Sequence, residues 1–221
     1  MTRTVDEPVK TAFPDAVATL VFSDYNQLAA TLDETVPAGV EAVMYDPEDW
    51  SFTPAAQQQN PALYEKLAAE AAHAHGLALI AAPAENLVAE GGGGNSETKY
   101  QQYISGDYAG QAAKYADVLE IQAQGLEANP AEYAQFLAQA IVQAKAANPD
   151  ITIYAGLSTS CNGGGAVTSA ELYQDVKATE NEVAGYWLNI AGPSPYSPNV
   201  KACNPELAIG LLNDLWAVAK T

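Results

Sequence analysis

Short apolar segments alternate with longer helical segments along the chain, and this alternation restricts the possible folds most strongly. The six segments that we expect to be strands are Thr19–Ser23, Ala42–Tyr45, Leu77–Ala82, Val118–Gln122, Thr152–Leu157 and Tyr186–Ile190. From the second onward they start roughly 35 residues apart, which is enough for one strand and one crossover helix. Such alternation with short loops predicts a parallel sheet covered by helices.

Helix starts are marked by asparagine before proline, because asparagine is a favoured N-cap residue and proline is favoured at the first helical position. Three such pairs occur, at Asn60-Pro61, Asn129-Pro130 and Asn204-Pro205. Thr168 and Glu171 have the spacing of a capping box. Between Glu132 and Asn148 apolar residues recur at helical spacing, which predicts an amphipathic helix. We expect the glycine-rich stretch Glu85–Thr98 to be an irregular surface loop or a lid.

Polar residues inside the strands distinguish between two parallel architectures. They alternate in the pairs Glu120 with Gln122, Thr152 with Tyr154, and Trp187 with Asn189. A sheet covered by helices on both faces should be almost entirely apolar, whereas the lumen of a (β/α) barrel accepts polar side chains. No glycine-rich nucleotide-binding motif follows any strand, which weakens the case for an open doubly wound sheet. We therefore expect an α/β fold of the TIM-barrel type, in which fewer than eight regular strands are evident.

The chain has 221 residues, a length that allows a single domain with a substantial core. Residues 1–15 are polar, so we expect an N-terminal arm there and one (β/α)-barrel-like domain over residues 16–221. Residues 1–15 do not have the pattern of a secretory signal, and no apolar run approaches the ~18 residues of a membrane-spanning helix.

The charge balance restricts the partners. Asp and Glu number 27 against 9 Lys and Arg, for a formal net charge of −18, which disfavours nucleic acid and anionic membranes. Because Arg3 is the only arginine, the chain offers almost nothing to phosphorylated or multiply carboxylated ligands. We expect a neutral small molecule or glycan, or a cation, and no cofactor. The alternative is that the acidity serves only solubility.

Catalytic groups of parallel α/β proteins lie at the carboxyl ends of the strands. His73 and His75 precede the third strand, so we expect them at the opposite edge, near a helix C-terminus, and outside any triad or zinc site. Asp46, Glu48 and Asp49 offer oxygen ligands without the spacing of a calcium loop, and we predict no metal site.

Two strand ends carry the candidate catalytic carboxylates. Asp46 and Glu48 follow the second strand and precede Trp50 and Phe52, and carboxylates beside aromatic rings suit a sugar ring. Glu120 lies inside the fourth strand between apolar residues. We expect it to be buried, with a pKa raised by the loss of solvent, as suits a general acid. The competing interpretation is a structural hydrogen-bond network.

Further residues of these strand ends are candidates for binding the substrate. They are Trp50, Gln122, Gln124, Tyr154, Ser158, Trp187 and Asn189. They suit a neutral hydroxylated or aromatic ligand. Ser158 has no histidine base nearby in the predicted fold, so we do not expect it to be a nucleophile.

Cys161 and Cys203 are the only cysteines, so one disulfide is the sole intramolecular possibility. In the entropic description such a bond would stabilise the fold by about 3–4 kcal/mol. We favour the disulfide and hence an extracellular or cell-surface location. The alternative is two free thiols in the cytoplasm.

Several segments are similar to those of a known group of proteins. They are Tyr45–Pro54, Ala72–Leu77, Ile121–Glu127, Ala155–Thr159 and Gly185–Ile190. Together they resemble a family of largely uncharacterised bacterial proteins, often exported, that look like glycoside-hydrolase barrels. The resemblance spans roughly Leu20 to Leu215. It implies a barrel and export, and it brings no established reaction.

Three functions remain open at this point. The first is a carboxylate-dependent glycoside hydrolase-like enzyme acting on a neutral substrate, with Glu120 and either Asp46 or Glu48 as the acids. The second is a lyase or cyclase acting on a neutral, partly apolar, natural-product-like substrate. The third is a barrel that binds a carbohydrate or metabolite without catalysis. The sequence does not indicate the oligomeric state.

Overall fold

The computed structural model describes residues 16–90, 98–159, 167–190 and 204–218. Six strands occur in these ranges: β1 (Thr19–Phe22), β2 (Ala42–Tyr45), β3 (Ala78–Ala81), β4 (Val118–Ile121), β5 (Thr152–Ser158) and β6 (Gly185–Asn189). Each predicted strand is confirmed to within one residue at either end.

Helices separate the strands. They are α2 (Tyr25–Glu34), α3 (Ala55–Gln59), α4 (Pro61–Ala74), α5 (Lys99–Ser105), α6 (Tyr108–Ala113), α7 (Pro130–Ala147), α8 (Ser169–Thr179) and α9 (Pro205–Val218). Three of them begin at the prolines of the Asn-Pro pairs, as predicted. The capping box is also confirmed, because the Glu171 amide donates to Thr168 Oγ1 at 3.2 Å and the Thr168 amide donates to Glu171 Oε2 at 2.8 Å.

The chain divides into two compact units. Unit 1 contains Met1–Glu120 and Val142–Thr152, and unit 2 contains Ile121–Ile141 and Ile153–Thr221. The predicted N-terminal arm, residues 1–15, lies outside the described residues.

The sheet of unit 1 winds in one direction. β1, β2 and β3 pair in parallel in the order of the chain, and Tyr45 of β2 is in register with Phe22 and Ala81. β4 follows as the parallel neighbour of β3. A doubly wound sheet would reverse its order at a switch point, and a barrel would not. This order confirms the α/β fold of the TIM-barrel type.

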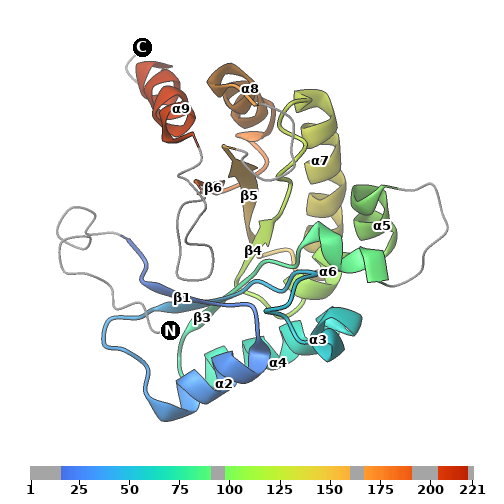
Figure 1. The fold of residues 1–221 in the computed structure, drawn as a ribbon, viewed down its shortest axis with the longest axis vertical. Coiled ribbons are helices and arrows are strands. Elements are labelled where there is room, and N and C mark those ends of the chain that lie inside the picture. Colours follow the sequence, from blue (N-terminus) through green and yellow to red (C-terminus); the bar gives the residue numbers. More distant parts are fainter. Residues whose placement is uncertain (1–15, 91–97, 160–166, 191–203, 219–221) are drawn as a thin grey trace. The chain divides into compact units, whose positions relative to one another are not determined.

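Helices α2 and α4 cover one side of β1–β3 and lie against each other (Figure 1). The buried face of α4 consists of Glu65, Ala68, Ala69 and Ala72, at the spacing of one helical stripe. Three alanines in this stripe allow the helix to approach the strands closely. The glutamate in the same stripe is the exception.

The chain between β3 and β4 differs from the prediction in part. The start of the expected irregular stretch forms a 3₁₀ helix, η1 (Glu85–Glu90), and residues 91–97 lie outside the described residues. Helices α5 and α6 follow, joined at Asp107, whose φ of 55° is left-handed. Gly110 lies beside it, and a Cβ at this position would displace the Asp107 carboxyl group. Such contacts have no periodic signature in the sequence.

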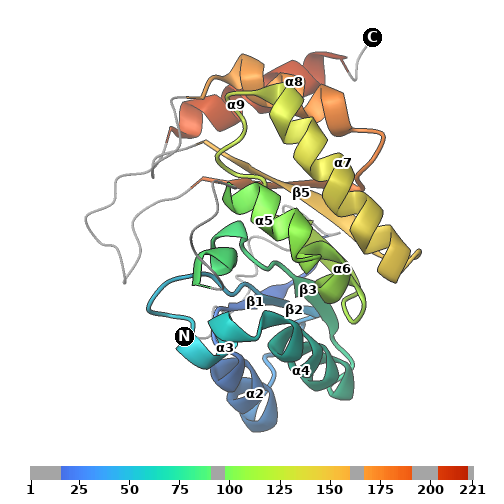
Figure 2. The same ribbon diagram turned by 90° about the vertical axis from the view of Figure 1, so that its right-hand side faces the viewer.

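In unit 2, β5 and β6 pair in parallel, with Ser158 in register with Asn189. Helices α8 and α9 lie side by side (Figure 2). The buried Tyr133 hydroxyl of α7 donates to the Gly156 carbonyl of β5 at 3.1 Å. This bond fixes the first part of α7 on β5.

His73 lies at the edge that the sequence predicts, opposite the carboxyl ends of the strands. Its Nε2 is 2.8 Å from Oδ2 of Asp117, the residue before β4, and His75 is the C-cap residue of α4. Both histidines therefore lie at the amino-terminal edge of the strands in unit 1. Within the described residues, no helix is both long enough and apolar enough to span a membrane.

Candidate functional site

The loop after β2 carries the first group of candidate residues, and it is held by its own hydrogen bonds. Thr53 Oγ1 accepts from the Glu48 amide at 3.1 Å and from the Trp50 indole Nε1 at 2.9 Å. The Gln58 amide group donates to the Trp50 and Thr53 carbonyls at 2.9 and 2.7 Å. The buried hydroxyl of Thr53 thus fixes both a candidate acid and a candidate aromatic residue.

Asn86 of η1 attaches the same loop to the segment after β3. Its Oδ1 accepts from the Asp49 amide at 2.9 Å, and its Nδ2 donates to Glu48 Oε2 at 3.3 Å. Sequence reasoning missed Asn86 and Thr53. A signal for Asn86 was available, because it is a polar residue shortly after the carboxyl end of a strand.

We expect Thr53→Val to lower the melting temperature by about 4–8 °C, because it removes two hydrogen bonds worth about 1 kcal/mol each while keeping the shape. The Trp50 ring should also lose its fixed position. Differential scanning calorimetry and indole fluorescence anisotropy measure the two effects. Thr35→Val, at the exposed end of α2, is the control. Unchanged anisotropy in Thr53→Val would contradict the assignment of Thr53 as the residue that orients the indole.

Trp50 and Phe52 form an exposed aromatic pair at the end of this loop. Their ring centroids are 5.2 Å apart with planes at 89°, and 38% and 46% of the two residues are exposed. An exposed edge-to-face pair can pack against the apolar face of a ligand.

Behind the loop, buried carboxyl groups lie around one tyrosine. Glu120 of β4 and Glu65 of α4 are each 1% exposed, and Glu85 of η1 is 7% exposed. All three raise the pKa of the fully buried Tyr103, although burial itself is the larger cause. The predicted burial of Glu120 is confirmed. Together with the half-buried Asp46 and Glu48, these residues form what we call the acid cluster: Asp46, Glu48, Glu65, Glu85 and Glu120.

Burial sets the protonation of two members of the acid cluster. The pKa of Glu65 is raised well above its usual value, first by burial and second by the charge of Asp46. The pKa of Glu48 is also raised by burial, a shift that the Asn86 hydrogen bond opposes and the charge of Glu85 reinforces. Both groups therefore hold a proton at higher pH than an exposed glutamate does.

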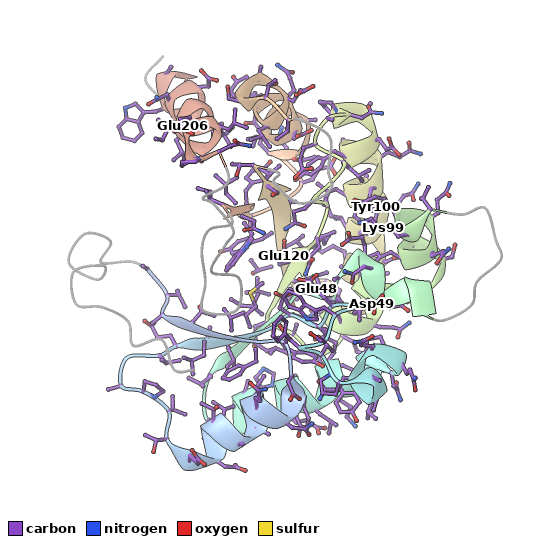
Figure 3. All side chains as sticks on the ribbon, viewed as in Figure 1. Glu48, Asp49, Lys99, Tyr100, Glu120 and Glu206 are labelled. Atoms are coloured by element: carbon purple, nitrogen blue, oxygen red, sulfur yellow. The ribbon has the colours of Figure 1, made fainter. Side chains whose placement is uncertain are left out.

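Lys99, at the start of α5, lies near two members of the acid cluster. It forms an ion pair with Glu85 and lowers the pKa of Glu48. Figure 3 labels Lys99 with Glu48 and Asp49 from the loop after β2 and Glu120 from β4. Sequence reasoning missed Lys99 and Glu65.

The remaining predicted binding residues belong to unit 2. Gln122, Gln124, Tyr154 and Ser158 are half-buried, whereas Trp187 is 39% exposed and Asn189 is exposed. Asp46, Glu48, Trp50 and Glu120 belong to unit 1, and the other six residues belong to unit 2. Cys161 and Cys203 lie outside the described residues.

Unit 2 has its own pair of buried acids. Glu127 accepts hydrogen bonds from the amides of Gly125 and Ser158, the latter at 2.8 Å. Asp175 of α8 is fully buried, and its two carboxyl oxygens have no hydrogen-bond partner within the described residues. Burial, and then the charges of Glu127 and Glu171, raises the pKa of Asp175 to about 8. The amide contacts give Glu127 a structural role.

In the described part of the chain, no group of three or more acidic, histidine or cysteine side chains has the arrangement of a metal site. The described part of unit 1 presents a barrel-type strand edge with clustered carboxyl groups, the ammonium group of Lys99 and two exposed aromatic rings. This arrangement can transfer protons and bind a polyhydroxylated or positively charged ligand.

Among the comparisons with known proteins, only the one with solved structures found similarity to the chain. No family model and no curated protein matches the chain. A Rhizomucor miehei β-1,3-glucanosyltransferase mutant in complex with laminaritriose is 15% identical over 80% of this chain and 63% of its own, with a TM-score of 0.43. A GH18 chitinase from Pseudoalteromonas aurantia is 14% identical over 90% of this chain and 74% of its own, with a TM-score of 0.47.

A third similar structure is the GH53 catalytic domain of Ignisphaera aggregans, which is 13% identical over 89% of this chain and 75% of its own, with a TM-score of 0.41. The chain thus spans 63% of the length of the glucanosyltransferase. At identities and TM-scores this low, the similarities indicate neither the reacting residues nor the substrate.

Proposed function

We propose that the chain is a carboxylate-dependent glycoside hydrolase-like enzyme that acts on a glycan without anionic groups. The observation that carries the proposal is the acid cluster, of which Asp46 and Glu48 follow β2 in the loop that also carries Trp50, and Glu120 lies in β4. Glycosidic bonds are cleaved by two carboxyl groups, one as acid and one as nucleophile or base. Aromatic rings pack on the apolar faces of sugars.

In the proposal Glu48 is the general acid. It is half-buried, so a substrate can reach it, and its raised pKa keeps the proton that a leaving oxygen needs. Glu120 or Asp46 is the second carboxylate. A carboxyl separation of about 5–5.5 Å would retain the anomeric configuration, and about 6.5–9.5 Å would invert it.

For unit 2, the proposal keeps the substrate-binding residues that the sequence predicts: Gln122, Gln124, Tyr154, Ser158, Trp187 and Asn189. An extracellular or cell-surface location also remains part of the proposal, because it follows from the predicted Cys161–Cys203 disulfide. Mass spectrometry of tryptic peptides before and after reduction tests that bond. A linked peptide supports it, and two free thiols contradict it.

The experiment that tests the function measures turnover of neutral β-linked oligosaccharides of glucose, N-acetylglucosamine and galactose, across pH 4–9. We expect Glu48→Gln to lower kcat by about two to four orders of magnitude, because it removes the proton donor and keeps the shape. In the wild type, activity should fall as pH rises through the pKa of Glu48, since only the protonated form donates.

Glu34→Gln is the matched control, because Glu34 is exposed at the end of α2 and the substitution is the same. Unaltered turnover in Glu48→Gln would overturn the role of Glu48 as general acid. Oligosaccharide binding without any turnover by the wild type would favour the non-catalytic barrel. Unsaturated products would favour the lyase.

A further inference from the structure

We propose that Gln57 is a positioning residue: acting through the short helix α3, it fixes the loop that presents Trp50 to a ligand. The inference rests on the proposed function in one respect, because it treats Trp50 as a contact of the substrate. Three observations support it: the hydrogen bonds of the buried Gln57 amide group, the hydrogen bonds that join α3 to the loop, and the length of α3.

Gln57 is a buried polar residue of α3, 1% exposed, and both polar atoms of its side chain form hydrogen bonds. Its Oε1 accepts from the Tyr25 backbone amide and from the Tyr45 hydroxyl, each at 2.9 Å. Its Nε2 donates to Asp24 Oδ1 at 2.6 Å. One side chain therefore joins α3 to β2 and to the start of α2.

The partners of Gln57 require a group that both accepts and donates. Tyr45 donates, because burial, reinforced by the nearby charges of Glu65 and Asp24, raises the pKa of its hydroxyl and keeps the proton in place. Asp24 Oδ1 is an acceptor, since it also caps α2 by accepting from the Asn26 amide at 2.9 Å. An amide supplies both functions without a charge, which suits a buried position.

The next residue of α3 connects the helix to the loop. The Gln58 side chain donates to the Trp50 and Thr53 carbonyls at 2.9 and 2.7 Å. Thr53 Oγ1 in turn accepts from the Trp50 indole Nε1 at 2.9 Å. The backbone of the loop and the indole ring therefore both depend on where α3 lies.

α3 is too short to hold this position without tertiary contacts. It has five residues, and its N-cap residue, Pro54, makes no side-chain cap hydrogen bond. A single helical turn is not stable by itself in water, because helix nucleation is unfavourable. The Gln57 hydrogen bonds to α2 and β2 are tertiary contacts of this kind. Their loss should allow α3 to shift and the Trp50 loop to open more often.

Three consecutive glutamines in α3 provide a matched control. Gln57 is buried, Gln58 is half-buried and Gln59 is exposed. The same substitution at positions 57 and 59 changes the composition of α3 equally, but only the first removes the hydrogen bonds to α2 and β2.

The test measures hydrogen exchange of the Trp50 indole N–H in the full chain at pH 5. This proton is bonded to Thr53 and exchanges with water when the loop opens. Trp50→Phe identifies its signal among the three indole signals in the NMR spectrum. We expect Gln57→Met to accelerate the exchange about tenfold, because methionine fills a similar space and makes none of the three hydrogen bonds. Gln59→Met should stay within about twofold of the wild type.

Gln57→Glu is the conservative variant that should restore the hydrogen bonds. At pH 5, burial beside Asp24 keeps the introduced carboxyl group protonated, so it donates to Asp24 and accepts from Tyr45 as the amide does. Exchange in Gln57→Glu should therefore stay within about twofold of the wild type. A role in packing alone predicts slow exchange in Gln57→Met. That result, or equal acceleration in Gln57→Met and Gln57→Glu, would overturn the proposal.

Tyr45→Phe replaces Gln57→Met if circular dichroism shows that the latter does not fold. It removes one of the three hydrogen bonds and keeps the buried ring, so we expect an acceleration of about threefold. Unchanged exchange in Tyr45→Phe would then overturn the proposal.

Calorimetric binding of the neutral β-linked oligosaccharides separates this inference from the proposed function. We expect Gln57→Met to weaken binding about fivefold and Gln59→Met to leave it unchanged, because a mobile loop must be ordered on binding. A wild type that binds none of these oligosaccharides would contradict the proposed function, and the exchange rates would still decide whether Gln57 positions Trp50. Faster exchange in Gln57→Met with unaltered oligosaccharide affinity would overturn the role of this positioning in binding.

Discussion

Glu120→Gln is expected to lower turnover of an identified glycan by about two to four orders of magnitude while the protein stays folded. The glutamine keeps the shape of a side chain that is 1% exposed, and it removes the carboxyl group beside Tyr103. The measurement is kcat at the pH optimum, with circular dichroism to confirm the fold.

A structural Glu120 would give the opposite pattern. Turnover in Glu120→Gln would then match the wild type, and the melting temperature would change instead. That result would remove Glu120 from the proposed mechanism. Glu34→Gln, exposed at the end of α2, should change neither quantity and serves as the control.

Asp175→Asn is expected to make the free energy of unfolding less dependent on pH. The change in this free energy between pH 4 and pH 8 should be smaller than in the wild type by about 2–3 kcal/mol. In the wild type the pKa of Asp175 is raised to about 8 by burial and by the nearby charges of Glu127 and Glu171. Below about pH 4 the group is protonated in both the folded and the unfolded chain, so it adds nothing to the pH dependence of stability.

Between these two pH values the unfolded chain releases the proton and the folded chain keeps it. The folded state then binds more protons, so the free energy of unfolding decreases as pH rises to about 8. Urea unfolding at pH 4, 6 and 8 measures this slope, and Asp214→Asn, at an exposed position of α9, is the control. If the free energy of unfolding falls with pH as steeply in Asp175→Asn as in the wild type, the raised pKa of Asp175 would be contradicted.

The strands could be predicted closely from the sequence because each is a short apolar run bounded by helix signals. Val43 and Leu79, for example, are fully buried at the centres of β2 and β3. The alternation of strands with helices also identified the parallel α/β class, because parallel neighbours require a crossover helix. The polar residues inside the strands then favoured the barrel type. The region of η1, α5 and α6 was not foreseen, because these elements are short and carry little periodic signal.

The candidate site was predictable only in part. The search for polar residues at strand ends found Asp46, Glu48 and Glu120, and the structure places all three in unit 1. Glu65 and Asp175 were missed because they lie on helices. Each occupies the buried stripe of its helix, at the positions expected for an apolar residue. An acid in an apolar helical stripe is therefore a signal that a search confined to strand ends overlooks.

The hydrogen bonds around Thr53 and Asn86 have a thermodynamic consequence for recognition. A loop that must become ordered on binding loses conformational entropy, which reduces affinity. The loop from Glu48 to Thr53 is already closed by its own side chains, so this loss is small. Ligand affinity at Trp50 should consequently depend on the contacts made and hardly on the flexibility of the ligand-free loop.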